Sequence, residues 1–224
     1  IAYNQLASLM SGHEASIYSK KVNQPGGWTG WRPFTVKQKI EESLEITSFY
    51  LYPTDGGNIA SHLPGQYISV RLFLPELNLL QPRQYSVSSS PNGKYYRISV
   101  KKEKGSTHPD GMISNRLHEF VQVGDTIELT SPSGNFVLKD KEISKPQVFI
   151  SGGIGQTPLL AMVEDLALNK TNAQRIIWIH GCRNEQVHAF KNRLAELSSV
   201  NPAFENHLFY EQLEVENEYA KSGI

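Results

Sequence analysis

Hydrophobic residues recur at steps of three and four positions near the start of the chain. Ala2, Leu6, Leu9 and Ile17 follow this spacing, which is the period of one face of an α-helix. Residues 23–27 then bring one proline and two glycines, which oppose a continued helix. The pattern therefore predicts an amphipathic helix followed by a linker over residues 1–27.

Between residues 34 and 138 the pattern changes to short runs in which apolar and polar residues alternate. Residues 66–72 and 96–100 are examples, and glycine-rich turns separate the runs. Asn92-Gly93 is a candidate for a two-residue hairpin turn. One short helix is expected near residues 113–120. So many short strands predict an antiparallel β-barrel, to which we assign residues 28–143.

A third pattern begins after Pro146, where continuous apolar runs alternate with helical periods. Strands are expected at 147–151, 175–180 and 207–210, and a helix is expected at 158–168. Val187, Phe190, Leu194 and Leu197 indicate a second helix. This order predicts a parallel α/β domain over residues 144–224. Three strands are fewer than a doubly wound sheet usually has, so we expect a partial domain and a chain truncated at both ends.

The composition excludes several classes of protein. The 224 residues suffice for two compact units, and 22 basic residues balance 22 acidic ones, which disfavours nucleic-acid and membrane partners. The single cysteine, Cys182, cannot form an internal disulfide or a cysteine-ligated metal site, which favours the cytoplasm. The histidines lack zinc-type spacing, so no metal site is expected.

Residues 151–158 form the first segment with candidate chemistry. Gly153 and Gly155 follow a buried strand and open a helix, where free N–H groups attract the diphosphate of a dinucleotide. Thr157 is expected to cap this helix and Pro158 suits its first turn. The spacing is Gly-x-Gly-x-x-Pro, which departs from the usual dinucleotide fingerprint. A nucleotide site and a merely tight turn are equally compatible with this segment taken alone.

Residues 83–86 form the second such segment, on an expected barrel strand. Alternation places Arg83 and Tyr85 on one side and Gln84 and Ser86 on the other. Arg83 can bind phosphate through two hydrogen bonds, and Tyr85 can lie against a flat ring. A surface arginine beside a core tyrosine is the simpler explanation of this segment in isolation.

Two further features lie near the ends of expected elements. Tyr67 is a second aromatic residue after a turn, although it also suits an ordinary strand entry. Gly111 and Ser114 open the short helix and would offer further free N–H groups to a phosphate, or form a plain helix start.

Taken together and in this order, residues 83–86, Gly111-x-x-Ser114 and Gly153-x-Gly155-x-x-Pro158 resemble the ferredoxin-NADP reductase superfamily. Within it, Gly26-Gly27-Trp28, residues 64–67 and residues 187–190 are similar to the reductase half of flavohaemoglobins. Residues 1–22 then resemble the end of the last globin helix. The resemblance covers essentially the whole chain.

The resemblance implies an FAD-dependent NAD(P)H oxidoreductase that serves a nitric oxide dioxygenase. Electrons would pass from NAD(P)H through FAD to haem b in a globin domain of the parent protein, which converts nitric oxide and oxygen to nitrate. FAD would be held by Tyr67, Arg83, Gln84, Tyr85, Ser86, Gly111 and Ser114. The nicotinamide nucleotide would be held by Gly153, Ile154, Gly155, Gln156, Thr157 and Pro158. Ser86, near the flavin nitrogen that accepts hydride, is the expected catalytic residue.

Arg183 follows the second parallel strand, where a cation favours NADPH through its 2′-phosphate. Glu185 is close in sequence, so the coenzyme stays open, and a solvated loop charge is the simpler explanation of Arg183. Two other functions share the same motifs. One is a stand-alone flavin reductase for a separate oxygenase, and the other is an interaction domain that has lost its cofactors.

Overall fold

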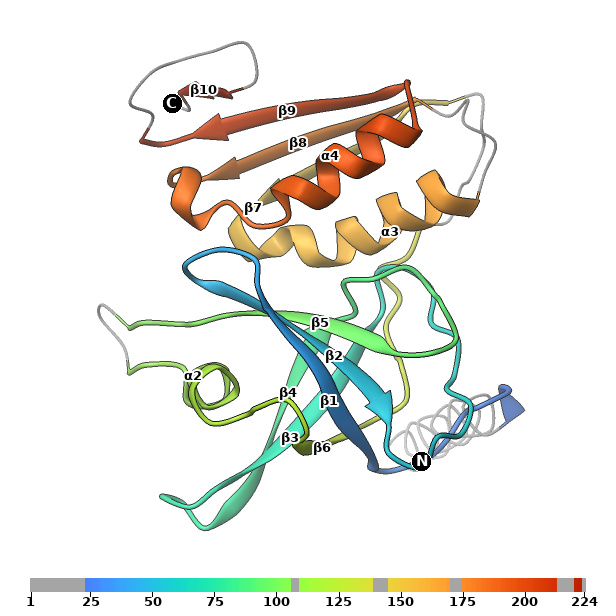
Figure 1. Ribbon diagram of the computed structural model, residues 1–224, viewed down its shortest axis with the longest axis vertical. Coiled ribbons are helices and arrows are strands. Elements are labelled where there is room, and N and C mark those ends of the chain that lie inside the picture. The colour runs from blue at the N-terminus through green and yellow to red at the C-terminus, as the bar shows by residue number, and fades with distance from the viewer. Residues whose placement is uncertain (1–22, 106–108, 139–144, 170–174, 213–219, 223–224) are drawn as a thin grey trace, which may run out of the picture.

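The computed structural model describes residues 23–105, 109–138, 145–169, 175–212 and 220–222, so the helix predicted within residues 1–22 lies outside the described residues. Two sheets, each formed by a continuous part of the chain, lie one above the other in Figure 1. The sequence prediction of an antiparallel barrel followed by a parallel α/β unit is confirmed. We call the two parts the barrel unit and the parallel-sheet unit.

The barrel unit is a six-stranded antiparallel sheet with the strand order β4-β3-β6-β1-β2-β5. Its elements are β1 (Arg32–Glu41), β2 (Ile46–Pro53), β3 (Tyr67–Leu74), β4 (Leu79–Ser86), β5 (Tyr96–Lys101), α2 (Met112–Glu119) and β6 (Thr126–Leu129). Val87, directly after β4, forms an antiparallel bridge with Ile98 of β5, and the Ser88 amide donates to the Arg97 carbonyl over 2.7 Å. These contacts join the two edge strands and close the barrel.

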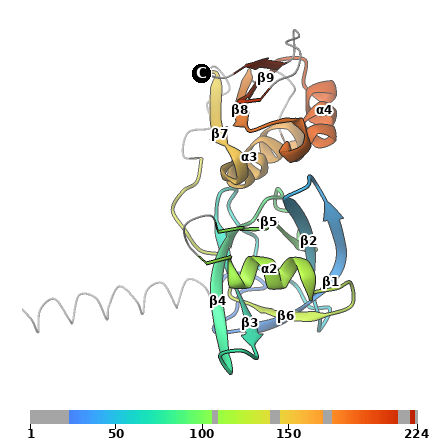
Figure 2. The same cartoon turned by 90° about the vertical axis from the view of Figure 1, so that its left-hand side faces the viewer.

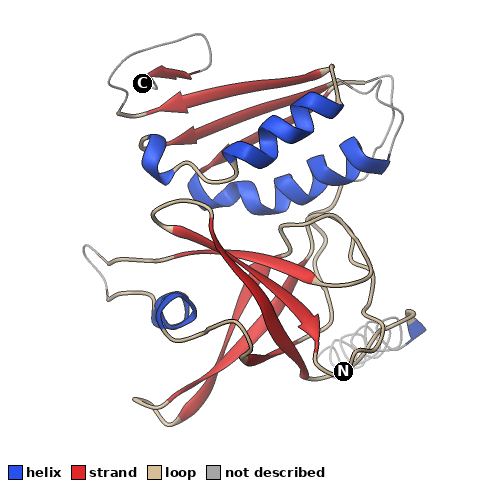
Figure 3. Ribbon diagram, viewed as in Figure 1, coloured by secondary structure: helices blue, strands red, loops and turns tan. Residues whose placement is uncertain are grey.

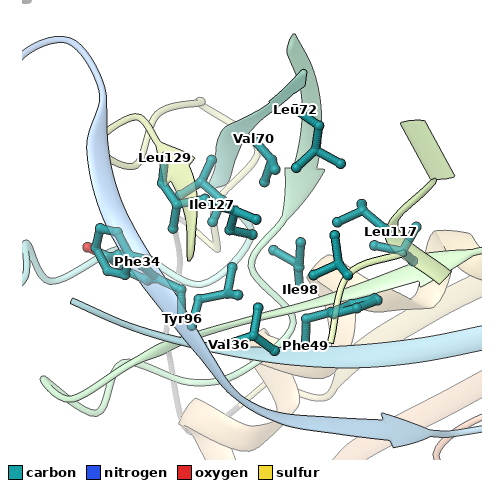
Figure 4. Close-up of a cluster of buried hydrophobic side chains, with 14 of the residues drawn as sticks. Phe34, Val36, Phe49, Val70, Leu72, Tyr96, Ile98, Leu117, Ile127 and Leu129 are labelled. Atoms are coloured by element: carbon teal, nitrogen blue, oxygen red, sulfur yellow. The ribbon is translucent and has the colours of Figure 1, made fainter. Parts of the chain in front are cut away.

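Alternating side chains fill the inside of the barrel. In β3 the residues Ile68, Val70, Leu72 and Leu74 are buried, as the sequence pattern predicts. Figure 4 shows Val70 and Leu72 meeting side chains from neighbouring strands and Leu117 from α2. The labelled members are Phe34, Val36, Phe49, Val70, Leu72, Tyr96, Ile98, Leu117, Ile127 and Leu129. This core fills the interior of the barrel.

Trp28 fixes the segment before β1 to this core. Its ring lies 5.6 Å from that of Phe34, and its Nε1 donates to the Leu129 carbonyl over 3.2 Å. Gly26 has a φ of +73°, and a Cβ there would lie 2.5 Å from the carbonyl carbon of Ile59. Residues 26–28 are therefore packed on the barrel unit rather than extended as a free connection.

The parallel-sheet unit has the strand order β10-β9-β8-β7, and all pairs are parallel. Its elements are β7 (Gln147–Gly152), the 3-10 turn η1 (Gly153–Gly155), α3 (Gln156–Asn169), β8 (Ile176–Cys182), the 3-10 turn η2 (Glu185–Val187), α4 (Lys191–Val200), β9 (Phe204–Tyr210) and β10 (Ala220–Ser222). Helices α3 and α4 cover one face of this sheet (Figure 2). On the opposite face Val148 is 53% exposed and Ile150 71%. No helix of the described residues covers that face.

The parallel-sheet unit differs from the sequence prediction in two ways. A fourth strand, β10, is present but too short to produce a hydrophobic pattern. The helix expected from Val187 onward is two elements, because Phe190 adopts the left-handed conformation with a φ of +66° and α4 begins after it. The helical spacing of apolar residues therefore continues across a point where the helix is interrupted, and no glycine or proline in the sequence marks this point.

The predicted Asn92-Gly93 turn lies in a longer loop than expected. The Asn92 Oδ1 accepts hydrogen bonds from the amides of Lys94 and Tyr95, and Gly93 has a φ of +69°. Moving away from the turn, the first backbone hydrogen bond between the two flanking segments joins Ser88 to Arg97. The Asn-Gly turn is therefore present, but it does not close a two-residue hairpin.

Helix α3 lies between its own sheet and the barrel unit (Figure 3). Ile46 of β2 is 2% exposed and packs in the core formed by α3 and α4. Gly65, before β3, lies against the chain that leads to β7 and against Met162 of α3. The two units thus share packed surfaces. None of the helices in the described ranges has the length and hydropathy that a membrane crossing requires.

Replacing Gly65 with alanine is expected to destabilise the protein by about 3 kcal/mol, because its φ is +100° and the new Cβ would overlap the Phe136 carbonyl oxygen. Gly93→Ala is the control, since Gly93 has a similar positive φ of +69° but no atom within 4 Å of a Cβ. That change should cost about 1 kcal/mol. Urea unfolding curves measure both, and equal losses would show that close packing at Gly65 is unimportant.

Candidate functional site

A glycine-rich turn ends β7 and opens space at the carboxyl end of the parallel sheet. Gly153 has a φ of +48°, a conformation that favours glycine. A Cβ added at Gly152, Gly153 or Gly155 would meet no atom within 4 Å, and the same holds at Gly181 on the end of β8. The ends of both strands therefore leave room for a ligand beside exposed backbone.

Gln156 begins α3 directly after this turn. Its side chain is only 1% exposed, yet neither its amide nitrogen nor its amide oxygen has a hydrogen-bond partner among the described residues. An unpartnered buried amide costs free energy unless a ligand or water satisfies it. The turn thus combines open space, helix N–H groups and a polar side chain that lacks a partner, which fits a dinucleotide diphosphate.

The prediction that Thr157 caps α3 is wrong. Helix α3 begins at Gln156, and the Thr157 hydroxyl donates back to the Ile154 carbonyl over 3.1 Å. The 3-10 turn of residues 153–155 runs directly into the helix and replaces a side-chain cap. Pro158 lies in the first turn of the helix, as expected.

Strand β4 presents the second candidate segment. Arg83 is exposed, and its guanidinium donates over 2.8 Å to the carbonyl of the adjacent Pro82. It forms no ion pair with any described residue, so its charge is available to an anion. Tyr85 is half-buried against the barrel core, and burial raises the pKa of its phenol to about 12. Tyr85 is therefore neutral near pH 7.

The register of β3 and β4 confirms the predicted alternation. Tyr67 lies opposite Ser86, whereas Tyr85 and Arg83 lie opposite the buried residues Ile68 and Val70. Opposed residues of an antiparallel pair share a face. Tyr67, Gln84 and Ser86 are therefore on the outer face, and the Ser86 hydroxyl is partly exposed there without a hydrogen-bond partner among the described residues.

The start of α2 has free backbone donors but no further side-chain donor. Gly111 makes no side-chain capping bond, and the Ser114 hydroxyl donates to the Gly111 carbonyl over 3.1 Å. Arg116 forms an ion pair of 3.6 Å with Glu76, in the β3–β4 hairpin. The helix therefore lies beside the strands that carry Tyr67 and Ser86.

Both candidate segments lie on one side of the molecule. Figure 2 shows β4 and β7 along the same side, with the upper end of β4 directed toward α3. The chain that leaves β4 reaches α3 at Ser90, whose amide donates to the Glu164 carboxylate over 2.9 Å. The barrel strand and the glycine-rich turn are thus linked through the first half of α3.

Arg183 lies in the loop after β8 with 53% of its side chain exposed, as expected for a solvated loop charge. Its guanidinium forms an ion pair with Glu45, in the connection between β1 and β2. Beside it, the Leu44 amide donates to the Gln186 carbonyl over 3.1 Å. This exposed ion pair connects the two units, because Glu45 belongs to the barrel unit and Arg183 to the parallel-sheet unit.

Sequence reasoning missed a buried polar chain under the same edge of the sheet. His180 Nδ1 lies 2.8 Å from the Ser151 hydroxyl, and the His180 and His188 rings stack with centroids 5.5 Å apart. His188 Nδ1 lies 2.9 Å from the Tyr210 hydroxyl. Strand alternation could have placed His180 on the helix-covered face, but nothing in the sequence pairs it with His188.

Burial keeps both histidines neutral. It lowers the pKa of His180 to about 4, although the bond with Ser151 opposes the shift. Burial lowers the pKa of His188 to about 3, and the nearby charge of Lys191, as well as that of His180 once protonated, acts in the same direction. The polar chain therefore carries no charge at neutral pH.

The free energy of unfolding is expected to fall as the pH decreases from about 6.5 toward about 4. Unfolded histidines, with an ordinary pKa near 6.5, bind protons in this range, whereas folded His180 and His188 do not. Each contributes a slope of about 1.4 kcal/mol per pH unit. His188→Gln should remove its share of the slope in urea unfolding curves, while exposed His207→Gln is the control. An unchanged slope in His188→Gln would contradict the neutral, buried state.

Comparison with known proteins gives a consistent family. The family model described as oxidoreductase FAD-binding domain matches residues 33–138, and that described as oxidoreductase NAD-binding domain matches residues 149–223. The chain is 46% identical over 213 residues to a flavohemoprotein of Bordetella pertussis, a match that covers 95% of this chain and 52% of that protein. A flavohemoprotein of Rhizobium meliloti is 44% identical over 211 residues, covering 94% and 52%. The chain thus spans about half the length of these relatives.

Solved structures agree with this assignment. A flavohemoglobin from Malassezia yamatoensis, with bound FAD and heme, has a TM-score of 0.80 at 22% identity and shows the same fold, covering 98% of this chain and 54% of that one. The Flavohem-like FAD/NAD binding domain of nitric oxide dioxygenase from Vibrio cholerae has a TM-score of 0.78 at 35% identity and covers 86% of this chain and 78% of that one. The chain therefore belongs to the flavohaemoprotein family of FAD- and NAD-binding oxidoreductase domains.

Proposed function

We propose that this chain is the reductase part of a nitric oxide dioxygenase. It takes a hydride from NAD(P)H onto FAD and passes electrons to the haem of a globin domain, where nitric oxide and oxygen are converted to nitrate. The observation that carries the proposal is the placement, on one side of the molecule, of Arg83 on β4, which has no ion-pair partner among the described residues, and of an open glycine-rich turn after β7. The same proposal divides the chain at residues 1–27, 28–143 and 144–224.

The residues present fit FAD along β4 and α2. Bound FAD would supply the chemistry that accepts a hydride and releases electrons singly. Arg83 and the N–H groups that follow Gly111 and precede Ser114 would bind its diphosphate. Tyr85 and Tyr67 would pack against its rings, while Gln84 and Ser86 hydrogen-bond from the outer face of the strand. Ser86 would hold the ring system in place at the atom that receives the hydride.

The nicotinamide nucleotide would approach the carboxyl ends of β7 and β8. Gly153, Ile154 and Gly155 leave room for its diphosphate, the N–H groups at the start of α3 would bind it, and Thr157 and Pro158 shape that first turn. The unpartnered Gln156 amide would gain a hydrogen bond there. Because Arg183 forms an ion pair with Glu45, a 2′-phosphate would have to compete with a carboxylate. This arrangement favours NADH.

Matches to flavohemoproteins across 94–95% of the chain argue against the two other functions considered above. A stand-alone flavin reductase shares the motifs, but the relatives named here are flavohemoproteins. An interaction domain without cofactors would have no use for the open turn or for an Arg83 that has no ion-pair partner among the described residues. We place the protein in the cytoplasm, with nicotinamide nucleotide and a globin domain as its partners.

The first test of the proposal is a visible spectrum of the purified protein with added FAD, before and after anaerobic addition of NADH. Bound flavin that loses its absorbance on addition of NADH supports the proposed function. A protein that fails to retain FAD contradicts it. Nitrate production by the complete parent protein, and its loss without the reductase part, tests the dioxygenase reaction.

Arg83→Ala is expected to weaken FAD binding at least tenfold, roughly the 1.5–3 kcal/mol of a charge-assisted hydrogen bond. Quenching of flavin fluorescence during titration measures the affinity. Arg175→Ala is the control, because Arg175 is an exposed arginine whose partner is Glu205 at the opposite end of the parallel sheet. Unchanged affinity in Arg83→Ala would remove the diphosphate role.

Ser86→Ala is expected to slow flavin reduction by NADH about tenfold or more while FAD affinity changes less than about twofold, because one hydroxyl beside the reacting atom is lost. Stopped-flow absorbance under anaerobic conditions gives the rate constant. Ser199→Ala, at an exposed serine of α4, serves as the control. Equal rates for Ser86→Ala and the unmodified protein would exclude a catalytic role for this hydroxyl.

A further inference from the structure

Residues 187–190 take no part in the nucleotide sites proposed above, although they belong to the segments that mark the family. Phe190 has a φ of +66° and a ψ of +19° at the residue before α4, a conformation that residues other than glycine rarely adopt. Its side chain is 2% exposed. A bulky residue in this conformation indicates that the position of its ring matters.

The Phe190 ring lies against an arginine from the other unit. The guanidinium carbon of Arg97, on β5 of the barrel unit, is 5.9 Å from the centroid of the Phe190 ring and 6.0 Å from that of Tyr50 on β2. Arg97 is 6% exposed. A buried guanidinium between two aromatic faces is held through both cation–π contacts and packing.

The counter-ion of Arg97 is Glu164 of α3, which is 3% exposed. Arg97 Nη2 lies 3.0 Å from Glu164 Oε1, and the Ser90 amide donates to Glu164 Oε2 over 2.9 Å. Arg193 of α4 also donates to Oε1, over 2.8 Å. One buried carboxylate thus accepts two hydrogen bonds from the barrel unit and one from its own unit.

Glu164 is close in sequence and in space to both cofactor segments. Ser90 lies only four positions after Ser86, at the end of the β4 segment. Glu164 lies seven positions after Thr157 in one continuous helix, about 10 Å along its axis. The bond between Ser90 and Glu164 is therefore a short, buried connection from the flavin strand to the nucleotide turn.

We propose that Arg97, Glu164 and Phe190 form a junction lock that sets the angle between the barrel unit and the parallel-sheet unit, with Glu164 as the positioning residue. The inference rests on the proposed function, because its purpose is to bring the two flat rings to reacting distance. A buried ion pair is suited to fixing an angle, because its geometry is directional and a rotated junction would leave the charges unpaired. Apolar contacts such as Ile46 on α3 and α4 would tolerate sliding.

The lock is tested by the distance between the units. Nitroxide labels are attached at Lys37→Cys on β1 and Ala195→Cys on α4, both exposed, in a Cys182→Ser background, and pulsed electron resonance gives the distance distribution. Glu164→Gln is expected to broaden this distribution at least twofold. Arg193→Gln is the matched control, because it removes a bond to the same carboxylate within one unit and should leave the distribution unchanged.

A second pair of variants covers the case in which a single change prevents folding. Arg97→Gln with Glu164→Gln leaves no unpaired buried charge at the junction from this ion pair, and the double variant should fold yet show the same broadening. Distributions for the double variant and for Glu164→Gln that are as narrow as that of the unmodified protein would overturn the proposal. So would equal broadening in Arg193→Gln.

Kinetics then separate positioning from the proposed function itself. In protein loaded with FAD, Glu164→Gln is expected to lower the rate of flavin reduction at saturating NADH at least tenfold, with FAD affinity changed less than twofold. An unchanged rate would overturn the positioning role. Failure of the unmodified protein to bind FAD would instead contradict the proposed function, while the distance measurement, made without any nucleotide, still decides whether the lock exists.

Discussion

The carboxylate of Glu164 accepts hydrogen bonds from both halves of the molecule, and the spatial relation of the two proposed cofactor sites depends on it. A buried charge is tolerated only when its partners are in place, so the bonds from Arg97, Ser90 and Arg193 are satisfied together. Helix α3 carries this carboxylate and begins directly after the glycine-rich turn. Because a helix is stiff, the contact with the barrel unit at Glu164 also positions the nucleotide end of the parallel sheet.

The two proposed cofactor segments would bind phosphate groups by different means. At the β7–α3 turn the protein offers backbone N–H groups and empty space, which only glycines can leave beside the chain. On β4 it offers an arginine without a carboxylate partner among the described residues, held on a strand whose register is fixed by the barrel core. The neutral polar chain from Ser151 to Tyr210 lies beneath the first segment and adds no charge that would compete for a diphosphate.

Local pattern was enough to predict the barrel, the parallel sheet and the glycine-rich turn before α3, because these follow from periodicity and from glycine placement. The cofactor roles of residues 83–86 and 153–158 stay predictions. The local sequence pattern failed where tertiary packing determines the backbone conformation or the partner of a side chain. The left-handed backbone conformation of Phe190, which residue propensities do not favour, interrupts the predicted helix. Thr157 does not cap α3 as expected, because a 3-10 turn continues directly into the helix. Arg97, Glu164 and the stacked histidines are far apart in sequence, so their partners emerge only once the sheets are formed.

The face of the parallel sheet that none of the described helices covers has a consequence for the solubility of the protein. Val148 and Ile150 present branched apolar side chains to water two positions apart on β7, and Phe209 of β9 is 37% exposed on the same face. With 22 cationic and 22 anionic residues, the chain has almost no long-range repulsion near pH 7. Two such faces can therefore approach each other with little electrostatic repulsion. Added salt should have little effect on their association, because there is little net charge for it to screen.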